Sequence, residues 1–253
     1  MSIQHPDDHD WDQRLSRIST QWTVLRQAHG DESDAAAKAR QELIQRYGGA
    51  VYRYLLAAVR DPHAADDLSQ EFALRFLRGR FRHADPGRGR FRDYVKTALF
   101  HLVGDHRRRA GRGPSRVSLG DAEPAVPPAE VHGDDRAFLE SWRQELLARA
   151  WRRLAGAAGQ AGQPYYAVLR YRVEHPDVPS ARMAEELSGR LGKPLTAANA
   201  RQLLHRARAK FAELLLDETR HSLGGAAGRL EDELAELNLL KYCREALGRG
   251  SAG

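Results

Sequence analysis

Cysteine is nearly absent from this chain of 253 residues, which contains a single one, Cys243. A lone cysteine excludes an intrachain disulfide and a zinc site built on several thiolates. We therefore expect a protein of a reducing compartment such as the cytoplasm. Long apolar runs are also missing, since no stretch approaches the roughly 18 residues that a membrane span needs. The first residues, MSIQHPDDHDWDQ, lack the basic and apolar parts of a signal peptide.

Motifs of catalysis and cofactor binding are absent as well. The chain has no G-x-G-x-x-G, Walker loop, H-E-x-x-H or nucleophile elbow. His5, Asp7 and His9 could chelate a metal only in a terminus that offers no supporting groups around it. We therefore expect a protein that is not an enzyme and that has no cofactor and no metal site.

Positive charge is what the chain has in excess, and it is concentrated in one segment. The whole chain carries a net charge of +6. Between Arg78 and Arg112 lie eleven Lys and Arg residues and only three Asp residues, a larger excess than that of the whole chain. Such a segment favours a polyanionic partner.

Apolar residues recur at three- and four-residue steps along most of the chain, and no convincing strand appears. This pattern predicts an all-α protein of two small helical domains joined by a Pro- and Gly-rich linker. The predicted helices span 35–59, 64–78, 91–109, 138–154, 165–173, 180–191, 197–216 and 226–247. The expected parts are an N-terminal extension (1–35), a first domain (36–112), the linker (113–136), a second domain (137–218) and a C-terminal helical extension (219–253).

An acidic stretch opens the second predicted helix. Its polar residues are Asp66, Asp67, Gln70 and Glu71, and residues four apart share one helix face. Exposed carboxylates beside an amide suit docking against Arg or Lys of a partner protein. Acids at a helix start are also favoured by the helix dipole alone. The residues by themselves leave both interpretations open.

A Gly- and Arg-rich turn and the helix after it carry cations next to aromatic rings. Cations attract phosphates without regard to sequence, and rings offer stacking platforms for unpaired bases. The combination suits melted DNA, although the rings could equally belong to the core and the arginines to a solvated surface. The candidate residues are Arg88, Arg90, Arg92, Tyr94, Lys96 and His101.

The predicted helices 180–191 and 197–216 resemble a helix-turn-helix with additional residues at 189–194. Arg, Asn and Gln near the start of such a second helix read base edges in the major groove. A basic amphipathic helix within a bundle is the alternative. The candidate residues are Asn199, Arg201, Gln202, His205, Arg206 and Arg208.

Four segments, taken in order, resemble a bacterial RNA polymerase sigma factor of the extracytoplasmic-function (ECF) type of the sigma-70 family. They are Y-G-x-A-V-Y-R-Y-L at 47–55, A-D-D-L-S-Q-E at 65–71, G-R-F-R-D-Y-V-K-T-A at 89–98 with R-R-R at 107–109, and N-A-R-Q-L-L-H-R-A-R-A-K-F at 199–211. The first three correspond to region 2 of the family and the last to region 4.

The resemblance implies a role for each candidate set. The Asp66, Asp67, Gln70 and Glu71 set would dock on the β′ clamp helices of core RNA polymerase, and region 4 would meet the β flap. The set from Arg88 to His101 would melt and read the minus-ten promoter element, and the set from Asn199 to Arg208 would read the minus-thirty-five element. The protein would direct promoter recognition, DNA melting and transcription initiation, with an anti-sigma factor or other regulator as a further candidate partner.

Two other functions fit the residues without the resemblance. One is a helix-turn-helix repressor or activator that acts without core polymerase, against which the acidic motif argues. The other is an RNA-binding or scaffold protein made of basic helices, which a preference for structured RNA over promoter DNA would reveal.

Overall fold

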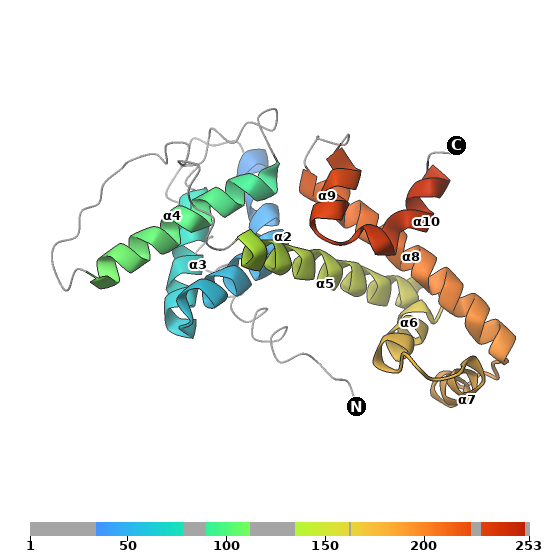
Figure 1. Cartoon of the computed structure of the whole chain (residues 1–253). Helices are drawn as coiled ribbons and strands as arrows, with labels where there is room; N and C mark the ends of the chain where they lie inside the picture. Colours follow the sequence, from blue (N-terminus) through green and yellow to red (C-terminus); the bar gives the residue numbers. More distant parts are fainter. Residues whose placement is uncertain (1–33, 78–89, 112–134, 162, 224–228, 251–253) are drawn as a thin grey trace. The chain divides into compact units, whose positions relative to one another are not determined.

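The structure is a computed structural model that describes residues 34–77, 90–111, 135–161, 163–223 and 229–250. The N-terminal extension up to residue 33 and the linker up to residue 134 lie outside this part. Every regular element in the described part is a helix (Figure 1), which confirms the all-α prediction. The helices are α2 (Asp34–Val59), α3 (Pro62–Leu77), α4 (Phe91–Gly111), α5 (Asp135–Ala161), α6 (Tyr165–Glu174), α7 (Ser180–Leu191), α8 (Ala197–Leu223), α9 (Leu230–Glu236) and α10 (Leu240–Gly250). They belong to two compact units, 1–142 and 143–253.

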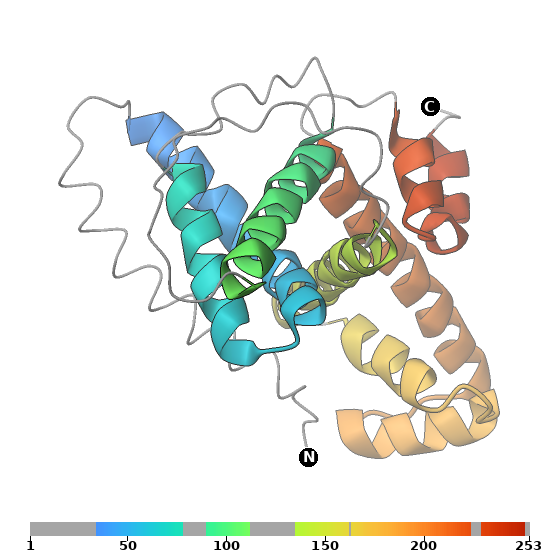
Figure 2. The ribbon, with the colours of Figure 1, turned by 60° about the vertical axis from the view of Figure 1, so that its left-hand side comes forward.

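The turn between α2 and α3 is built by two residues. Arg60 takes a left-handed backbone conformation with φ of 59°, and its N–H donates to the carbonyl of Leu56 at 2.8 Å, which ends α2. The Asp61 carboxylate accepts the N–H of His63 at 3.0 Å and so caps α3. Pro62 at the first helical position needs no N–H partner. The chain therefore reverses sharply, and α3 packs along α2 (Figure 2).

The core of the first unit combines aliphatic side chains of α2, α3 and α4 with an aromatic cluster. Leu55, Leu68 and Leu99 are buried. The rings of Tyr47 and Trp142 stack with centroids 4.5 Å apart, and Phe138 meets Tyr54 edge-on at 5.6 Å. Phe138 and Trp142 belong to the start of α5. We expected this part of the chain to be the beginning of the second domain, from residue 137. The compact units instead divide after Trp142, because apolar residues four apart on α5 meet aromatic residues on α2.

In the second unit, α6 and α7 pack against the first half of α8. Gly192 ends α7 with a left-handed φ of 64°, a conformation in which a side chain would be strained. The Ser188 hydroxyl then accepts the N–H of Leu195 at 2.8 Å. The Thr196 hydroxyl accepts the N–H of Asn199 at 3.1 Å, which makes Thr196 the cap of α8. The additional residues expected at 189–194 are thus the end of α7 and an ordered turn.

The C-terminal part differs from the sequence prediction. Helix α8 continues to Leu223 instead of ending near residue 216. The prediction of one helix over 226–247 is wrong, because α9 and α10 are separate helices. Asn238 is left-handed with φ of 54°, and the N–H of Leu239 donates to the carbonyl of Leu234 at 2.7 Å, a helix-ending pattern. A break there lets the Leu234 and Leu239 side chains both be buried.

Cys243 lies on the buried face of α10. Burial raises the pKa of its thiol to about 11, so the thiol is protonated at neutral pH and is a poor nucleophile. This agrees with the sequence, in which the residue belongs to an apolar helix face. Among the helices that the structure describes, none has an apolar stretch long enough to cross a bilayer.

The packing of Trp142 yields a first prediction. Trp142→Ala removes the ring that stacks on Tyr47 and should lower the free energy of unfolding by about 3–5 kcal/mol. Urea denaturation followed by circular dichroism measures this change. Trp142→Phe keeps a ring at the site and should recover most of the loss. An unchanged denaturation midpoint for Trp142→Ala would contradict the packing described here.

Candidate protein and nucleic-acid interfaces

The acidic residues of α3 lie opposite its buried face. Leu68, Phe72 and Phe76 point into the core. On the other side Asp67 and Gln70 are exposed, whereas Asp66 and Glu71 are half-buried. Burial of the apolar stripe therefore determines which way the polar groups point, because the two sets alternate with the helical period.

Glu71 is not simply a solvated carboxylate. Its Oε1 atom receives the guanidinium of Arg75, one turn further along α3, and lies 3.8 Å from Nη2 of Arg109 at the end of α4. The Glu71 side chain is 31% exposed. The Glu71 carboxylate is thus paired with two guanidiniums within the unit.

The candidate DNA-binding residues of the first unit occupy different environments. Arg88 lies outside the described residues. The Arg92 side chain is only 1% exposed and lies 3.7 Å from Asp93. It therefore lies inside the unit and not on the surface that we expected. Arg90 donates from Nε to the Asp93 carboxylate at 2.9 Å.

The remaining residues of this set are accessible in part. Lys96 forms an ion pair with Asp135 at 3.0 Å, which ties α4 to the first turn of α5. His101 is half-buried. Tyr94 is half-buried too, and desolvation raises the pKa of its hydroxyl, which stays protonated. The five described residues of this set thus do not form a single exposed surface.

The three arginines near the end of α4 have different partners in the first unit. Arg107 donates to the carbonyl of Ala58 in the last turn of α2 at 3.1 Å. Arg108 pairs with Asp105 of its own helix, and Arg109 faces Glu71. Although the R-R-R end belongs to the basic half of the sequence, one of its members, Arg109, contacts the acidic motif of α3.

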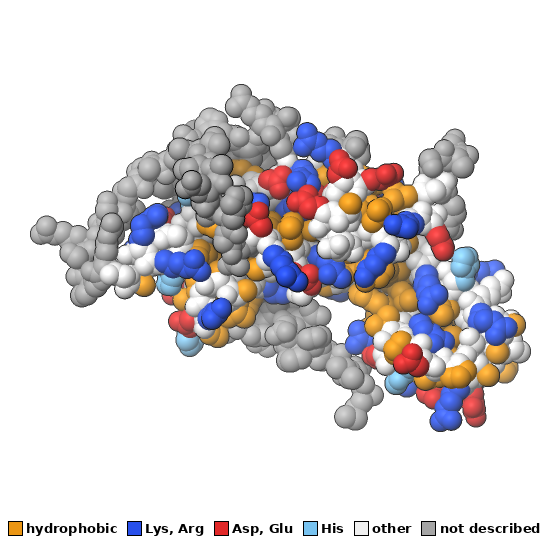
Figure 3. Space-filling model, in the orientation of Figure 1, with side chains coloured by type: hydrophobic (Ala, Val, Ile, Leu, Met, Phe, Trp, Pro, Cys, Tyr) orange, Lys and Arg blue, Asp and Glu red, His pale blue; other side chains and the backbone are white. Residues whose placement is uncertain are grey.

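In the second unit, all candidate base-reading residues are exposed. They alternate along α8 with Ala200, Leu204 and Ala207, which are buried. Figure 3 shows Lys and Arg side chains (blue) recurring over the part of this unit formed by α6–α8. The exposed set is Asn199, Arg201, Gln202, His205, Arg206 and Arg208. This is the side of α8 that could enter a DNA groove.

The pocket found among the described residues is mainly apolar. It lies among α2, α3 and α4 and is lined mostly by side chains such as Ile44, Phe72 and Val95. Two residues of its lining, Tyr47 and Ser69, carry a hydroxyl, and that of Ser69 donates to the carbonyl of Ala65 at 2.7 Å. Within the described ranges no three His, Cys, Asp or Glu side chains come together as a metal site would require.

Comparison with known proteins decides what the first unit is. Residues 43–113 match the family model of sigma-70 region 2. This segment belongs to the sigma-70 region 2 family. No curated protein and no solved structure matches the chain. The family functions in promoter-directed transcription initiation as a non-catalytic subunit, and it binds core RNA polymerase and promoter DNA.

The region 2 match includes most of α2 and all of α3 and α4. It therefore contains both the acidic docking candidates and the candidate minus-ten residues. The match does not extend to α8, so the assignment of the second unit to region 4 of a sigma factor is taken up as a proposal below.

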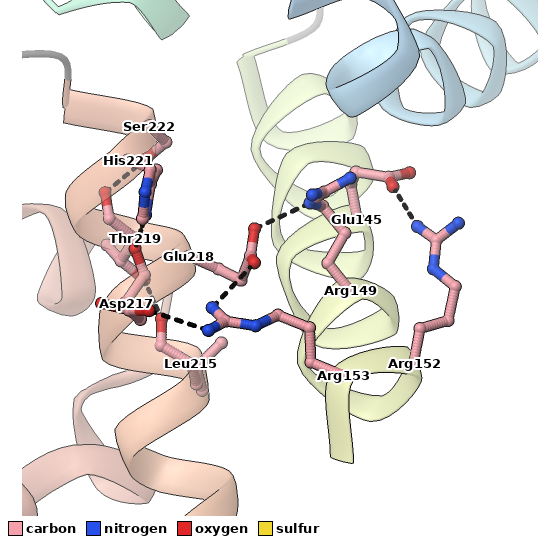
Figure 4. Close-up of polar contacts among 10 residues, drawn as sticks. All are labelled: Glu145, Arg149, Arg152, Arg153, Leu215, Asp217, Glu218, Thr219, His221 and Ser222. Carbon is pink, nitrogen blue, oxygen red and sulfur yellow. Dashed lines mark hydrogen bonds and ion pairs between the residues drawn. The ribbon is translucent and has the colours of Figure 1, made fainter. Parts of the chain in front are cut away.

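A group of charged residues in the second unit was missed by the sequence analysis (Figure 4). The Glu218 carboxylate on α8 is 1% exposed. It accepts hydrogen bonds from Nε of Arg149 at 2.7 Å and from Nη1 of Arg153 at 3.1 Å. Nη2 of Arg153 also reaches Asp217 at 2.9 Å. Burial lowers the pKa of Arg153, but these carboxylates raise it by more, so the net shift is upward.

These contacts hold the second half of α8 against α5. Trp151 of α5 packs beside Phe211 with ring centroids 4.9 Å apart, and Glu218 lies two turns further along the same face. Two features of the sequence could have revealed the group. Glu218 interrupts an apolar stripe, and Arg149 and Arg153 lie four apart on one helix face. The exposed basic residues in the first half of α8 thus belong to a helix whose second half is held against α5.

The buried carboxylate yields a second prediction. Glu218→Gln removes the charge that pairs with both guanidiniums and should destabilise the second unit by about 1–3 kcal/mol. Thermal denaturation measures the loss. Glu213→Gln on the same helix is the matched control, because Glu213 is exposed and pairs with the exposed Lys210. Such an exposed ion pair contributes about 1 kcal/mol at most. Equal effects of the two variants would contradict the anchoring role.

Proposed function

We propose that the protein is an ECF-type sigma factor that binds core RNA polymerase, recognises two promoter elements and assists DNA melting at the start of transcription. The region 2 match carries this proposal. It is supported by the way α3 is held, since its apolar side is buried and Asp67 and Gln70 face outward. A sigma factor of this kind would act in the cytoplasm.

The docking surface on polymerase would be Asp66, Asp67, Gln70 and Glu71, with the β′ clamp helices as the partner. Opposite charges that meet across an interface speed association and select the partner. Asp67 and Gln70 are accessible without rearrangement. Glu71 must exchange at least one of its present guanidinium partners, Arg75 or Arg109, to take part.

The minus-ten element would be met by the segment around the start of α4. Arg88, Arg90, Tyr94, Lys96 and His101 remain in this proposal, with the cations on phosphates and the ring beside unstacked bases. Arg92 would support the start of α4 from within, because its side chain is buried.

The minus-thirty-five element would be read by α8, and the β flap of polymerase would be the neighbouring protein partner. Residues near the start of a recognition helix contact base edges in the major groove, and Arg201 and Gln202 lie there with exposed side chains. Arg206 and Arg208, further along α8, are suited to phosphates of the same groove. The α5 contacts to Glu218 would keep this helix in position while it binds.

Reversing one docking charge tests the first contact. Asp67→Lys should weaken binding to core RNA polymerase at least tenfold, about 1.4 kcal/mol, because a favourable charge pair becomes a repulsive one. Titration of fluorescently labelled protein with purified core enzyme measures the affinity. Asp232→Lys is the matched control, since it makes the same charge change on an exposed acid of α9. Unchanged binding by a folded Asp67→Lys protein would refute docking through α3.

Removal of one base-reading side chain tests the contact in the second unit. Arg201→Ala should reduce initiation about 5- to 100-fold at promoters that depend on a minus-thirty-five element, because a bidentate contact to guanine is worth about 1–3 kcal/mol. Run-off transcription with core enzyme on a library of genomic promoter fragments measures it. Arg220→Ala removes the same charge from the exposed far end of α8 and should have little effect. An equal loss for both variants would count against base reading by α8.

A further inference from the structure

The contact between Glu71 and Arg109 joins two parts of the first unit that the sequence separates by function. Glu71 belongs to the acidic motif of α3, and Arg109 to the basic end of α4. Nη2 of Arg109 lies 3.8 Å from Oε1 of Glu71. That separation allows an ion pair but is too long for a hydrogen bond. The contact is therefore one that a competing charge can replace.

Arg109 is the exchangeable one of the two partners of Glu71. Arg75 contacts the same oxygen from the next turn of α3, and the helix itself keeps two side chains four residues apart within reach of each other. Arg109 comes from another helix, and its side chain is 62% exposed. Two guanidiniums around one carboxylate leave the site with a net positive charge, which opposes the approach of a further cation.

We propose that Arg109 is an intramolecular competitor for the polymerase-docking surface, and that docking displaces it from Glu71. This inference rests on the proposed docking of α3 against a basic surface of the polymerase. A free carboxylate attracts that surface, whereas a carboxylate already paired with Arg109 must first give up the pair. The end of α4 thus lowers the affinity of the free protein for core enzyme.

The neighbouring residue provides a matched control. Arg108 is also 62% exposed, but it pairs with Asp105 of α4 and not with Glu71. Arg109→Gln and Arg108→Gln therefore remove the same charge from adjacent, equally exposed positions. Only the first variant removes a partner of Glu71, so the difference between them isolates the contact from the general change in charge.

The experiment measures the Kd of each full-length variant for purified core RNA polymerase at low and high salt. Arg109→Gln should bind about two- to fivefold tighter than Arg108→Gln at low salt, the range expected for an exposed ion pair. The difference should shrink at about 0.5 M salt, where screening weakens exposed pairs. In a Glu71→Gln background the two arginine variants should bind core enzyme with equal Kd. Arg109→Lys, which keeps the positive charge, should bind as weakly as the unsubstituted protein and not as tightly as Arg109→Gln.

Two results would overturn the proposal. Equal affinities of Arg109→Gln and Arg108→Gln would show that the contact does not compete with docking. Weaker binding of Arg109→Gln would show that Arg109 itself binds the polymerase. Both results are separable from a failure of the proposed function, because the docking of α3 is tested independently by Asp67→Lys. If Asp67→Lys loses binding while Arg109→Gln and Arg108→Gln have equal Kd values, the result supports docking through α3 and refutes competition by Arg109.

Discussion

Burial of one apolar face by each helix is the constraint on which both candidate interfaces depend. In α3 the burial of Leu68, Phe72 and Phe76 turns Asp67 and Gln70 outward. In α8 the burial of Ala200, Leu204 and Ala207 has the same effect on the exposed polar set that begins at Asn199. A side chain that faces a partner is therefore positioned by neighbours that never touch that partner.

Arginine has several different roles in this protein, and position in the chain does not distinguish them. Arg92 is buried, and Arg107 binds a backbone carbonyl of α2. Arg149 and Arg153 hold a buried carboxylate between α5 and α8. Arg201 and Arg206 are exposed on α8. The fork-shaped guanidinium suits all these sites, because it can donate several hydrogen bonds in fixed directions or pair with an anion.

The sequence predicted the larger part of the fold. Helix α7 spans the predicted residues, and α2 and α6 agree to within a residue at their ends, because strong periodicity and clear stop signals coincide there. The split between α9 and α10 was not predicted. Leu230, Leu234, Leu237 and Leu240 keep a helical spacing through the break, and nothing in that spacing shows that Asn238 adopts a left-handed backbone.

The sequence by itself determined the all-α class, the family resemblance through the D-D-L-S-Q-E and R-F-R-D-Y-V segments, and which residues carry charge. Only the tertiary structure decided which of those charges are available to a partner. Arg92 and Arg201 both lie near the start of a predicted basic helix, yet the side chain of Arg92 is buried and that of Arg201 is exposed. Likewise, only the folded unit brings Glu71 and Arg109 together from different helices. The physical reason is that helical periodicity defines a face, whereas exposure and pairing depend on which other helix packs against that face.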